Sequence, residues 1–136
     1  MERFQILFVC AGNICRSPLA EGIFRHIATN AGRAAEFNIS SAGTGGWHHG
    51  DEPDHRYFDR FDLILTMDHE NLRDLLKIAP GEAIEKIHLF NGYVTGTDED
   101  IPDPYYGDRE DFERVYTMLF AGCSSLLATA GKALAS

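Results

Sequence analysis

Apolar runs with the length of β-strands alternate along the chain with stretches in which apolar residues recur at helical spacing. Residues 5–10 (Q-I-L-F-V-C) and 62–67 (D-L-I-L-T-M) are almost continuously apolar, which is typical of strands covered on both faces. Shorter runs predict two more strands, at residues 37–41 and 86–90. Helices are predicted between and after these strands, over residues 18–30, 68–78 and 112–133.

Local signals place the start of the first helix and the nature of two connections. Ser17 is a preferred N-cap residue and Pro18 suits the first helical position, so a helix is expected to begin there. The segment Asp51–Phe61 is short and charged, and we expect it to be partly helical. The segment Asn91–Asp111 is predicted to be a long acidic loop, because proline and glycine interrupt it.

This alternation of strands and helices predicts an α/β fold. A length of 136 residues suits a single domain, residues 1–136, with one core. The order of elements favours a four-stranded parallel sheet with helices on both faces, in a Rossmann-like topology. Ligands of such folds bind at the carboxyl ends of the strands, so the loop after the first strand is the first candidate site.

Charge and composition narrow the choice of partners and compartment. Acidic residues outnumber basic ones by 21 to 12, and the resulting net charge of −9 argues against nucleic acid and anionic membrane as partners. No apolar run approaches the roughly 20 residues that span a bilayer. The start, Met1–Phe4, lacks the features of a secretory leader, and three cysteines disfavour a disulfide framework. We therefore expect a cytoplasmic protein.

The loop C-A-G-N-I-C-R-S-P, between the first strand and the first helix, carries the most chemical information. Cys10 ends the strand, and five residues separate it from Arg16 at the mouth of the helix. Free N–H groups, the helix dipole and the guanidinium together form a cradle for a dianion. Gly12 allows close approach of the backbone, and Asn13 tolerates a left-handed conformation. Such surroundings stabilise a thiolate, to which the Ser17 hydroxyl can donate, so Cys10 is a candidate nucleophile.

Each of these residues alone has an ordinary explanation. A cysteine that ends an apolar strand is usually a core residue, as is expected of Cys123 in the last helix, and a lone arginine is usually a surface charge. The spacing of Cys10 and Cys15 resembles half of a metal site, but no second Cys or His pair stands at ligand spacing. Neither a metal nor a cofactor is therefore predicted. The joint pattern C-x5-R-S-P, after an apolar strand and before a capped helix, favours the phosphate cradle.

This loop closely resembles the active-site loop of low-molecular-weight protein tyrosine phosphatases. Four motifs carry the resemblance in order over nearly the whole chain: V-C-A-G-N-I-C-R-S-P-L-A-E, S-S-A-G-T-G-G-W, F-D-L-I-L-T-M-D-H-E-N-L-R-D-L and D-P-Y-Y-G. The resemblance implies hydrolysis of phosphotyrosine through a phosphocysteine intermediate. Cys10 would be the nucleophile, Arg16 would hold the phosphoryl oxygens with its planar fork, and Asp103 would act as general acid and then as general base.

The resemblance also assigns supporting roles. The Ser17 hydroxyl would stabilise the thiolate and help it leave in the second step. Asn13 would hold the shape of the loop through a network that includes Ser41. Further contacts to the phosphate would come from the backbone of Ala11, Gly12, Asn13, Ile14 and Cys15.

The departing phenolate needs a proton, and the D-P-Y motif points to its source. Asp103 stands between Pro102 and Pro104, which stiffen the backbone around it. A well-placed general acid accelerates such a step by about 10²- to 10⁴-fold. The resemblance places Trp47 and Tyr105 on either side of the substrate ring. A slot between two aromatic side chains favours a phenyl phosphate over phosphoserine.

Two positions of the loop bear on specificity and on redox behaviour. Protein arginine phosphatases are similar to this family but tend to carry Thr at the place of Ile14, so an apolar side chain there favours phosphotyrosine. Cys15 has two readings that stay open: a thiol that captures an oxidised Cys10 as a reversible disulfide, or a small buried residue.

The chain departs from the family between about Arg56 and Phe58, where a helix and a returning loop are missing. The remaining connection, residues 42–61, exceeds the roughly 10–12 residues that a crossover requires, so the fold can close. We expect an exposed apolar patch where the lost helix packed, or a partner that covers it, and a homodimer is one such arrangement. An altered rate or substrate range is expected rather than a lost mechanism.

Other functions stay open beside this one. Arsenate reductases share the loop and the fold but need additional resolving cysteines, whereas Cys123 lies in the predicted last helix. A noncatalytic phosphopeptide-binding module would need neither Cys10 nor Asp103, and an arginine or small-molecule phosphatase would use the same groups. The expected partners are a phosphotyrosine-containing protein or a small aryl phosphate, with inorganic phosphate as product. The sequence leaves open whether Tyr105 or Tyr106 is itself phosphorylated.

Overall fold

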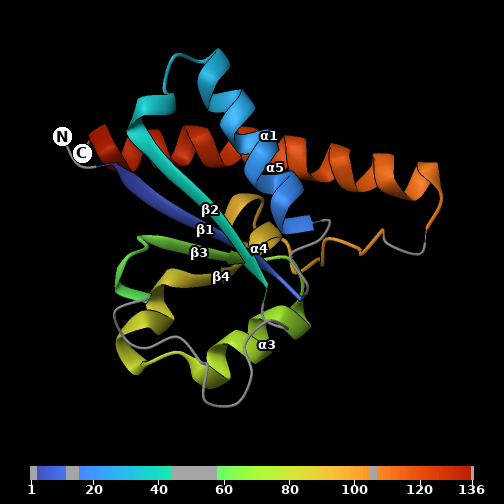
Figure 1. Ribbon diagram of the computed structural model, residues 1–136, viewed down its shortest axis with the longest axis horizontal. Helices are drawn as coiled ribbons and strands as arrows, with labels where there is room; N and C mark the ends of the chain where they lie inside the picture. Colours follow the sequence, from blue (N-terminus) through green and yellow to red (C-terminus); the bar gives the residue numbers. More distant parts are fainter. Residues whose placement is uncertain (1–2, 12–15, 44–57, 105–106, 136) are drawn as a thin grey trace.

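The chain forms one four-stranded sheet in which every pairing is parallel and the strand order is β2-β1-β3-β4 (Figure 1). The computed structural model describes residues 3–11, 16–43, 58–104 and 107–135, with side chains described up to residue 130. Because β1 lies between β2 and β3, the carboxyl end of β1 opens at the centre of one sheet edge. The strands are β1 (Phe4–Cys10), β2 (Phe37–Gly43), β3 (Leu63–Thr66) and β4 (Ile87–Leu89).

Helices cover both faces of the sheet. In Figure 1, α1 and α5 lie together on one side of the strands and α3 lies on the other. Two short 3-10 turns, Ala34–Glu36 and Gly81–Lys86, precede β2 and β4. The α-helices are α1 (Arg16–Asn30), α3 (His69–Ile78), α4 (Phe90–Val94) and α5 (Arg109–Ala135).

Alternate residues of β1 enter two separate hydrophobic clusters, as the two-residue repeat of a strand requires. Ile6 and Phe8 pack in the larger cluster, together with apolar residues of α1, α4 and α5. Leu7 and Val9 pack in the smaller cluster with Leu75 of α3. All four β1 side chains are essentially inaccessible to solvent. The almost unbroken apolar run of the first strand is therefore explained by burial on both faces.

The sequence-based prediction of the fold class is confirmed, and its errors lie at the ends of elements. The first helix begins at Arg16 rather than after Ser17, so Pro18 lies within the first turn, where its missing N–H costs no hydrogen bond. The predicted loop Asn91–Asp111 contains most of α4, because this helix of five residues is too short to show a periodic pattern.

The short helix α4 is held in place by close packing against α5. Phe90 and Val94 are buried, and both face Gly122 of α5. A Cβ atom on Gly122 would lie 2.4 Å from the Phe90 ring, so only glycine permits this approach. Gly122 in the middle of α5 is therefore explained by the close approach of α4.

The structure bears only in part on the predicted connection between β2 and β3. Residues 51–57 of the predicted, partly helical segment Asp51–Phe61 lie outside the described residues, whereas 58–59 are helical. Leu76 and Ile84 are exposed on the α3 side, with exposed fractions of 37% and 49%. That an apolar patch marks the place of the lost helix stays a prediction. Within the described part of the chain, no helix has the length and apolar character needed to cross a bilayer.

Candidate active site

Cys10 lies at the carboxyl end of β1, and its thiol is within hydrogen-bonding distance of a serine. The Cys10 Sγ atom is 2.9 Å from the Ser17 Oγ atom, and Ser17 Oγ is also 3.5 Å from the carbonyl oxygen of Ala42. Both residues are buried, with exposed fractions of 3% for Cys10 and 0% for Ser17. A strand end and a helix start thus bring a thiol and a hydroxyl together, as the loop motif predicts.

Arg16 begins α1, and its guanidinium reaches across the edge of the sheet. Its Nη1 atom donates to Asp68 Oδ2 at 2.6 Å and to the carbonyl oxygen of Ile101 at 2.9 Å. Asp68 is also the N-cap of α3, because its Oδ1 atom accepts from the Asn71 N–H at 2.7 Å. Only 5% of the Arg16 side chain is exposed. The guanidinium is therefore fixed by the segments that follow β3 and precede α5.

Asp103 approaches a different nitrogen atom of the Arg16 guanidinium from the one that Asp68 contacts. Its Oδ2 atom is 3.8 Å from Arg16 Nη2, and 57% of its side chain is exposed. The loop that carries it is tied to the end of β3, because the Ile101 N–H donates to the Met67 carbonyl oxygen at 2.8 Å. Asp103 therefore stands at the surface, next to a buried cation, where it can meet a group that enters from solvent.

The start of α5 fixes the other end of this loop. The side chain of Asp108 accepts from the Asp111 N–H at 3.0 Å, and the side chain of Asp111 accepts from the Asp108 N–H at 3.2 Å. This reciprocal pair is a capping box at a helix N-terminus. Ile101 and Asp108, on either side of Asp103 in the chain, are thus each held by hydrogen bonds.

Together these groups suit the transfer of a phosphoryl group. A thiol hydrogen-bonded to a hydroxyl can attack phosphorus, a guanidinium can bind the phosphoryl oxygens, and a carboxyl can protonate the leaving oxygen. The three groups come from the end of β1, the start of α1 and the loop before α5. The structure thus brings together the residues predicted to be catalytic: Cys10, Arg16 and Asp103.

The predicted support residue Ser41 has a different described partner from the one expected. Its Oγ atom donates to Glu21 Oε1 at 2.7 Å, and Arg25 donates to Glu21 Oε2 at 2.6 Å and to the Ile39 carbonyl oxygen at 3.0 Å. These contacts tie β2 to α1. The expected network through Asn13 lies outside the described residues and stays a prediction.

Of the remaining predicted site residues, most lie outside the part of the chain that the structure describes. Ala11 is described and exposed. The remaining members of the predicted site lie outside the described residues: Gly12, Asn13, Ile14, Cys15, Trp47 and Tyr105. The backbone donors to phosphate, the aromatic slot and the redox role of Cys15 therefore stay predictions.

Sequence reasoning missed the residues that hold Arg16 and the loop that carries Asp103. Asp68 follows directly after the apolar run 62–67, a position at which parallel sheets place functional side chains, so its place in the chain was a usable signal. The contact of Ile101 with Arg16 uses a backbone oxygen, which leaves no signal in the sequence, although the Ile101 side chain is itself buried in the larger hydrophobic cluster. The pair of contacts from His69 to Asp98 and Asp100 was also missed, because three polar residues in an acidic chain do not stand out.

Two side chains near these elements have displaced pKa values. Hydrogen bonds to Asp98 and then to Asp100 raise the pKa of His69. Burial raises the pKa of Cys123 to about 12, so this thiol stays protonated at neutral pH. Cys123 lies in α5 with its Sγ atom 3.8 Å from the Ala20 carbonyl oxygen, and a protonated, buried thiol is unreactive.

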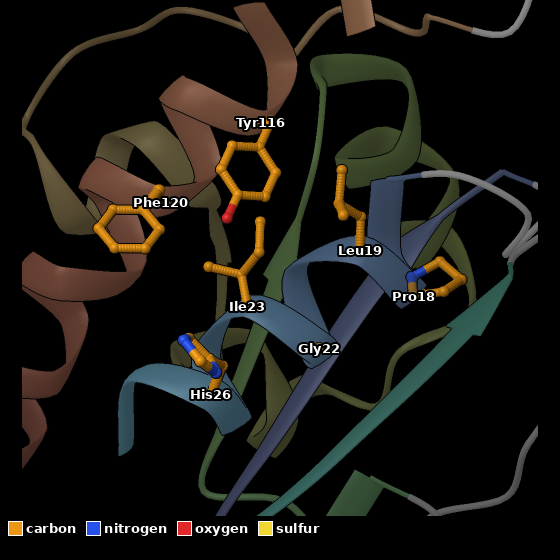
Figure 2. A pocket seen from close by; sticks show the side chains of 7 residues that line it. All are labelled: Pro18, Leu19, Gly22, Ile23, His26, Tyr116 and Phe120. Carbon is orange, nitrogen blue, oxygen red and sulfur yellow. The ribbon is translucent and has the colours of Figure 1, made fainter. Parts of the chain in front are cut away.

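A separate apolar groove runs between α1 and α5. Figure 2 shows side chains from both helices around a hollow of about 270 Å³. Tyr116 and Phe120, one turn apart on α5, stack at 6.1 Å between ring centroids and are 44% and 41% exposed. The groove includes none of the predicted site residues; it is lined by Pro18, Leu19, Gly22, Ile23, His26, Tyr116 and Phe120.

Comparisons with known proteins identify the family to which the chain belongs. The family model described as low molecular weight phosphotyrosine protein phosphatase matches residues 5–59 and 54–136. A low molecular weight protein-tyrosine-phosphatase of Streptomyces coelicolor is 39% identical over 92% of this chain and 92% of its own length. The chain therefore belongs to the low molecular weight phosphotyrosine protein phosphatase family.

Solved structures of phosphatases share this fold. A crystal structure of a protein tyrosine phosphatase from Entamoeba histolytica superposes with a TM-score of 0.84 at 30% identity, covering 96% of this chain and 98% of that one. The YwlE arginine phosphatase, in a mutant with a phosphorylated active-site serine, gives a TM-score of 0.80 at 25% identity, covering 95% and 97%.

The comparisons are also consistent with the shortened segment. The family model matches in two pieces that meet at residues 54–59, where the missing helix and loop are expected. The match to the Streptomyces relative extends over 151 positions although it uses only 92% of this 136-residue chain. Such a match requires residues in the relative that this chain lacks.

Proposed function

We propose that this protein hydrolyses phosphotyrosine through a covalent phosphocysteine intermediate. The observation that carries the proposal is the cluster at the sheet edge: the Cys10 thiol lies 2.9 Å from the Ser17 hydroxyl, and the Arg16 guanidinium is 2.6 Å from Asp68 and 3.8 Å from Asp103. Membership of the family supports the same reaction.

In the first step the Cys10 thiolate attacks the phosphorus atom. A sulfur–phosphorus bond forms, the bond from phosphorus to the phenolic oxygen breaks, and Asp103 gives its proton to that oxygen. Arg16 balances the charge on the equatorial oxygens, for which a planar fork of N–H donors is well suited. Tyrosine leaves, and the phosphoryl group stays on sulfur.

In the second step a water molecule attacks the phosphocysteine. The ionised Asp103 accepts a proton from the water, a new oxygen–phosphorus bond forms, and the sulfur–phosphorus bond breaks. The electron pair of that bond returns to Cys10, whose thiolate accepts a hydrogen bond from Ser17. Inorganic phosphate is the second product, and both Cys10 and Asp103 return to their starting states.

The proposed substrate is a phosphotyrosine-containing protein or a small aryl phosphate. The apolar Ile14 and the aromatic pair Trp47 and Tyr105 support a phenyl ring over a guanidinium or a short aliphatic chain. The YwlE relative is called an arginine phosphatase, so phosphoarginine is the second candidate and enters the test directly.

Arsenate reduction is disfavoured by the state of Cys123. A resolving cysteine must reach the nucleophile as a thiolate, whereas Cys123 is buried in α5 and its pKa is raised to about 12. We further propose that the protein acts in the cytoplasm, and the homodimer suggested by the missing segment stays a prediction. Sedimentation at high protein concentration that shows monomer alone would contradict the homodimer.

The test is turnover without added metal on three substrates: a phosphotyrosine peptide, the matched phosphoserine peptide and a phosphoarginine peptide. We expect many turnovers on phosphotyrosine, and none with Cys10→Ser, which removes the nucleophile. Cys123→Ala is the matched control, because it removes the other described thiol without burying a new polar group, and it should retain activity. Stoichiometric binding without turnover by folded wild type would instead identify a phosphopeptide-binding module.

A further inference from the structure

The acid loop, residues 98–103, has a second attachment that lies outside the predicted catalytic set. His69, the first residue of α3, meets this loop with its backbone and with both ring nitrogens. Its N–H donates to Asp100 Oδ1 at 3.0 Å, its Nδ1 atom lies 2.5 Å from the same oxygen, and its Nε2 atom lies 2.9 Å from Asp98 Oδ1. One imidazole therefore bridges two carboxylates of the loop.

The geometry of this bridge requires a particular protonation state. A carboxylate only accepts hydrogen bonds, and a neutral imidazole carries a single N–H. If His69 were neutral, one ring nitrogen would direct a lone pair at a carboxylate oxygen. Only the imidazolium can donate to both Asp98 and Asp100, so the bridge depends on a proton.

The bridge is joined to the catalytic groups by short stretches of backbone. Asp68 precedes His69 and pairs with Arg16, and Ile101 follows Asp100 and accepts from Arg16. Asp103 is three residues beyond Asp100, and its side chain is 57% exposed. The position of this carboxyl is therefore set by how the preceding residues of the loop are held.

We propose that His69 is a positioning residue, whose protonated ring holds residues 98–103 against the start of α3 and so keeps Asp103 beside Arg16 for proton transfer to the leaving group. The proposal rests on the proposed function. It assigns His69 no contact with substrate: the residue acts through the loop and through Asp103.

The charges around the ring agree with this role. From the acid loop, Asp98 and Asp100 face it directly. From α3, Arg73 lies one turn further along the helix, Glu70 is exposed, and Asp68 is directed to Arg16 and the Asn71 N–H. The two loop carboxylates raise the pKa of His69, so the ring stays protonated at pH values above about 6.5, the ordinary pKa of histidine. The bridge is thus complete below that value and is lost as pH rises through the raised pKa.

The kinetic test compares aryl phosphates with different leaving groups. A general acid matters for phenyl phosphate, whose leaving group is basic, and matters little for dinitrophenyl phosphate, whose leaving group departs without a proton. We expect His69→Gln to lower kcat/KM for phenyl phosphate by about 10-fold, part of the contribution of a general acid, and to leave dinitrophenyl phosphate nearly unchanged. His26→Gln, an exposed histidine on α1, is the matched control.

Two further variants separate positioning from a general loss of structure. His69→Arg keeps a permanent cation with several donors, so it should restore most of the activity that His69→Gln loses. Because arginine does not lose its proton, this variant should also lack the part of the fall in kcat/KM at basic pH that comes from deprotonation of His69. In the background of Asp103→Asn, His69→Gln should have no further effect, because the residue acts only through that carboxyl. Equal losses on both substrates, or an unchanged loss in the Asp103→Asn background, would overturn the proposal.

An NMR titration of the His69 ring tests the bridge without any turnover. The midpoint should lie above about 6.5 in the wild type and should fall in Asp98→Asn. An equal His69 midpoint in the wild type and in Asp98→Asn would overturn the bridge. A wild type without turnover overturns the proposed function and the positioning role together, whereas an active wild type that His69→Gln matches on both substrates overturns the positioning role alone.

Discussion

The two sides of the candidate active site are built in different ways. On the nucleophile side, Cys10 and Arg16 have exposed fractions of only 3% and 5% and belong to the regular elements β1 and α1. On the acid side, Asp103 is 57% exposed and lies on a loop between α4 and α5. The groups proposed to bind phosphate lie in the core itself, whereas the proposed acid stands at the surface, two residues after Ile101, whose side chain is buried in the core.

Substitutions on the two sides should therefore have different effects on stability and activity. A substitution on the buried side disturbs packing and charge pairing as well as chemistry, because every neighbour is fixed. A substitution of the exposed Asp103 side chain should change proton transfer and leave the fold intact. Four substitutions test the contrast, beginning with the largest expected effect.

Arg16→Lys should give the largest loss on the buried side. An ammonium group keeps the charge but cannot hold Asp68, the Ile101 carbonyl oxygen and a phosphoryl group in one plane. We expect kcat/KM for phosphotyrosine to fall on the order of 10³-fold, as when an arginine is lost from phosphoryl transfer. Steady-state kinetics measure this, with Arg109→Lys as the exposed control. A loss below tenfold would mean that the backbone cradle alone binds the phosphate.

Asp103→Asn should reduce activity with no loss of stability. Without a proton donor, kcat/KM for phenyl phosphate should fall about 10²-fold or more, and the fall at basic pH should disappear. The unfolding midpoint in urea should match that of the wild type, because the side chain is largely exposed. Asp59→Asn, also exposed, is the control. A basic limb that persists in Asp103→Asn would assign the acid to another residue.

Asp68→Asn probes the link between the two sides. Asparagine caps a helix as well as aspartate does, so the contact to the Asn71 N–H can remain while the charge that faces Arg16 is lost. Leaving a buried guanidinium without this carboxylate should lower the free energy of unfolding by about 1–3 kcal/mol.

The same variant should lose stability on its own but gain more stability than the wild type from added phosphate. Phosphate can replace the missing carboxylate beside Arg16, so the rise in Tm on adding inorganic phosphate should be larger in Asp68→Asn than in the wild type. Asp74→Asn on the same helix is the control for both measurements. Equal rises in Tm would mean that Asp68 and phosphate do not share the guanidinium.

Gly107→Ala should have the smallest effect and should act at the acid side alone. A Cβ atom there would lie 2.7 Å from Asp111 Cβ and 2.5 Å from Asp111 Oδ2, which displaces the capping box with Asp108. We expect a loss of about 1 kcal/mol in urea unfolding, the usual value of a helix cap. The control is Gly81→Ala, whose Cβ would meet nothing within 4 Å, and it should lose no stability. If both variants unfold alike, the capping box does not contribute.

The sequence predicted the regular elements of the fold and the residues of recognisable motifs better than it predicted the contacts between them. The four strands and the three long helices follow from apolar patterns, because burial on both sheet faces leaves a continuous record in the chain. Cys10, Arg16 and Asp103 were found because they lie in motifs whose chemistry is recognisable. The short helix α4 was missed because five residues carry too little pattern.

The contacts that join the two sides were not predictable in the same way. The bond from Arg16 to Ile101 uses a backbone oxygen, which any residue could supply. The contacts of His69 depend on how the acid loop is placed in space, and an acidic chain offers too many possible partners. Only the placement of Asp68 directly after a buried strand gave a signal that sequence reasoning could have used.

The contact between Arg16 and Ile101 also has a consequence for the order of events during folding. It joins residues 85 positions apart, so it forms only after most of the chain has been synthesised and has folded back onto the sheet. An emerging chain can place Cys10 at the end of β1 long before the acid loop exists. The enzyme therefore gains its proposed proton donor last, and a partly made chain has the proposed nucleophile but no complete catalytic centre.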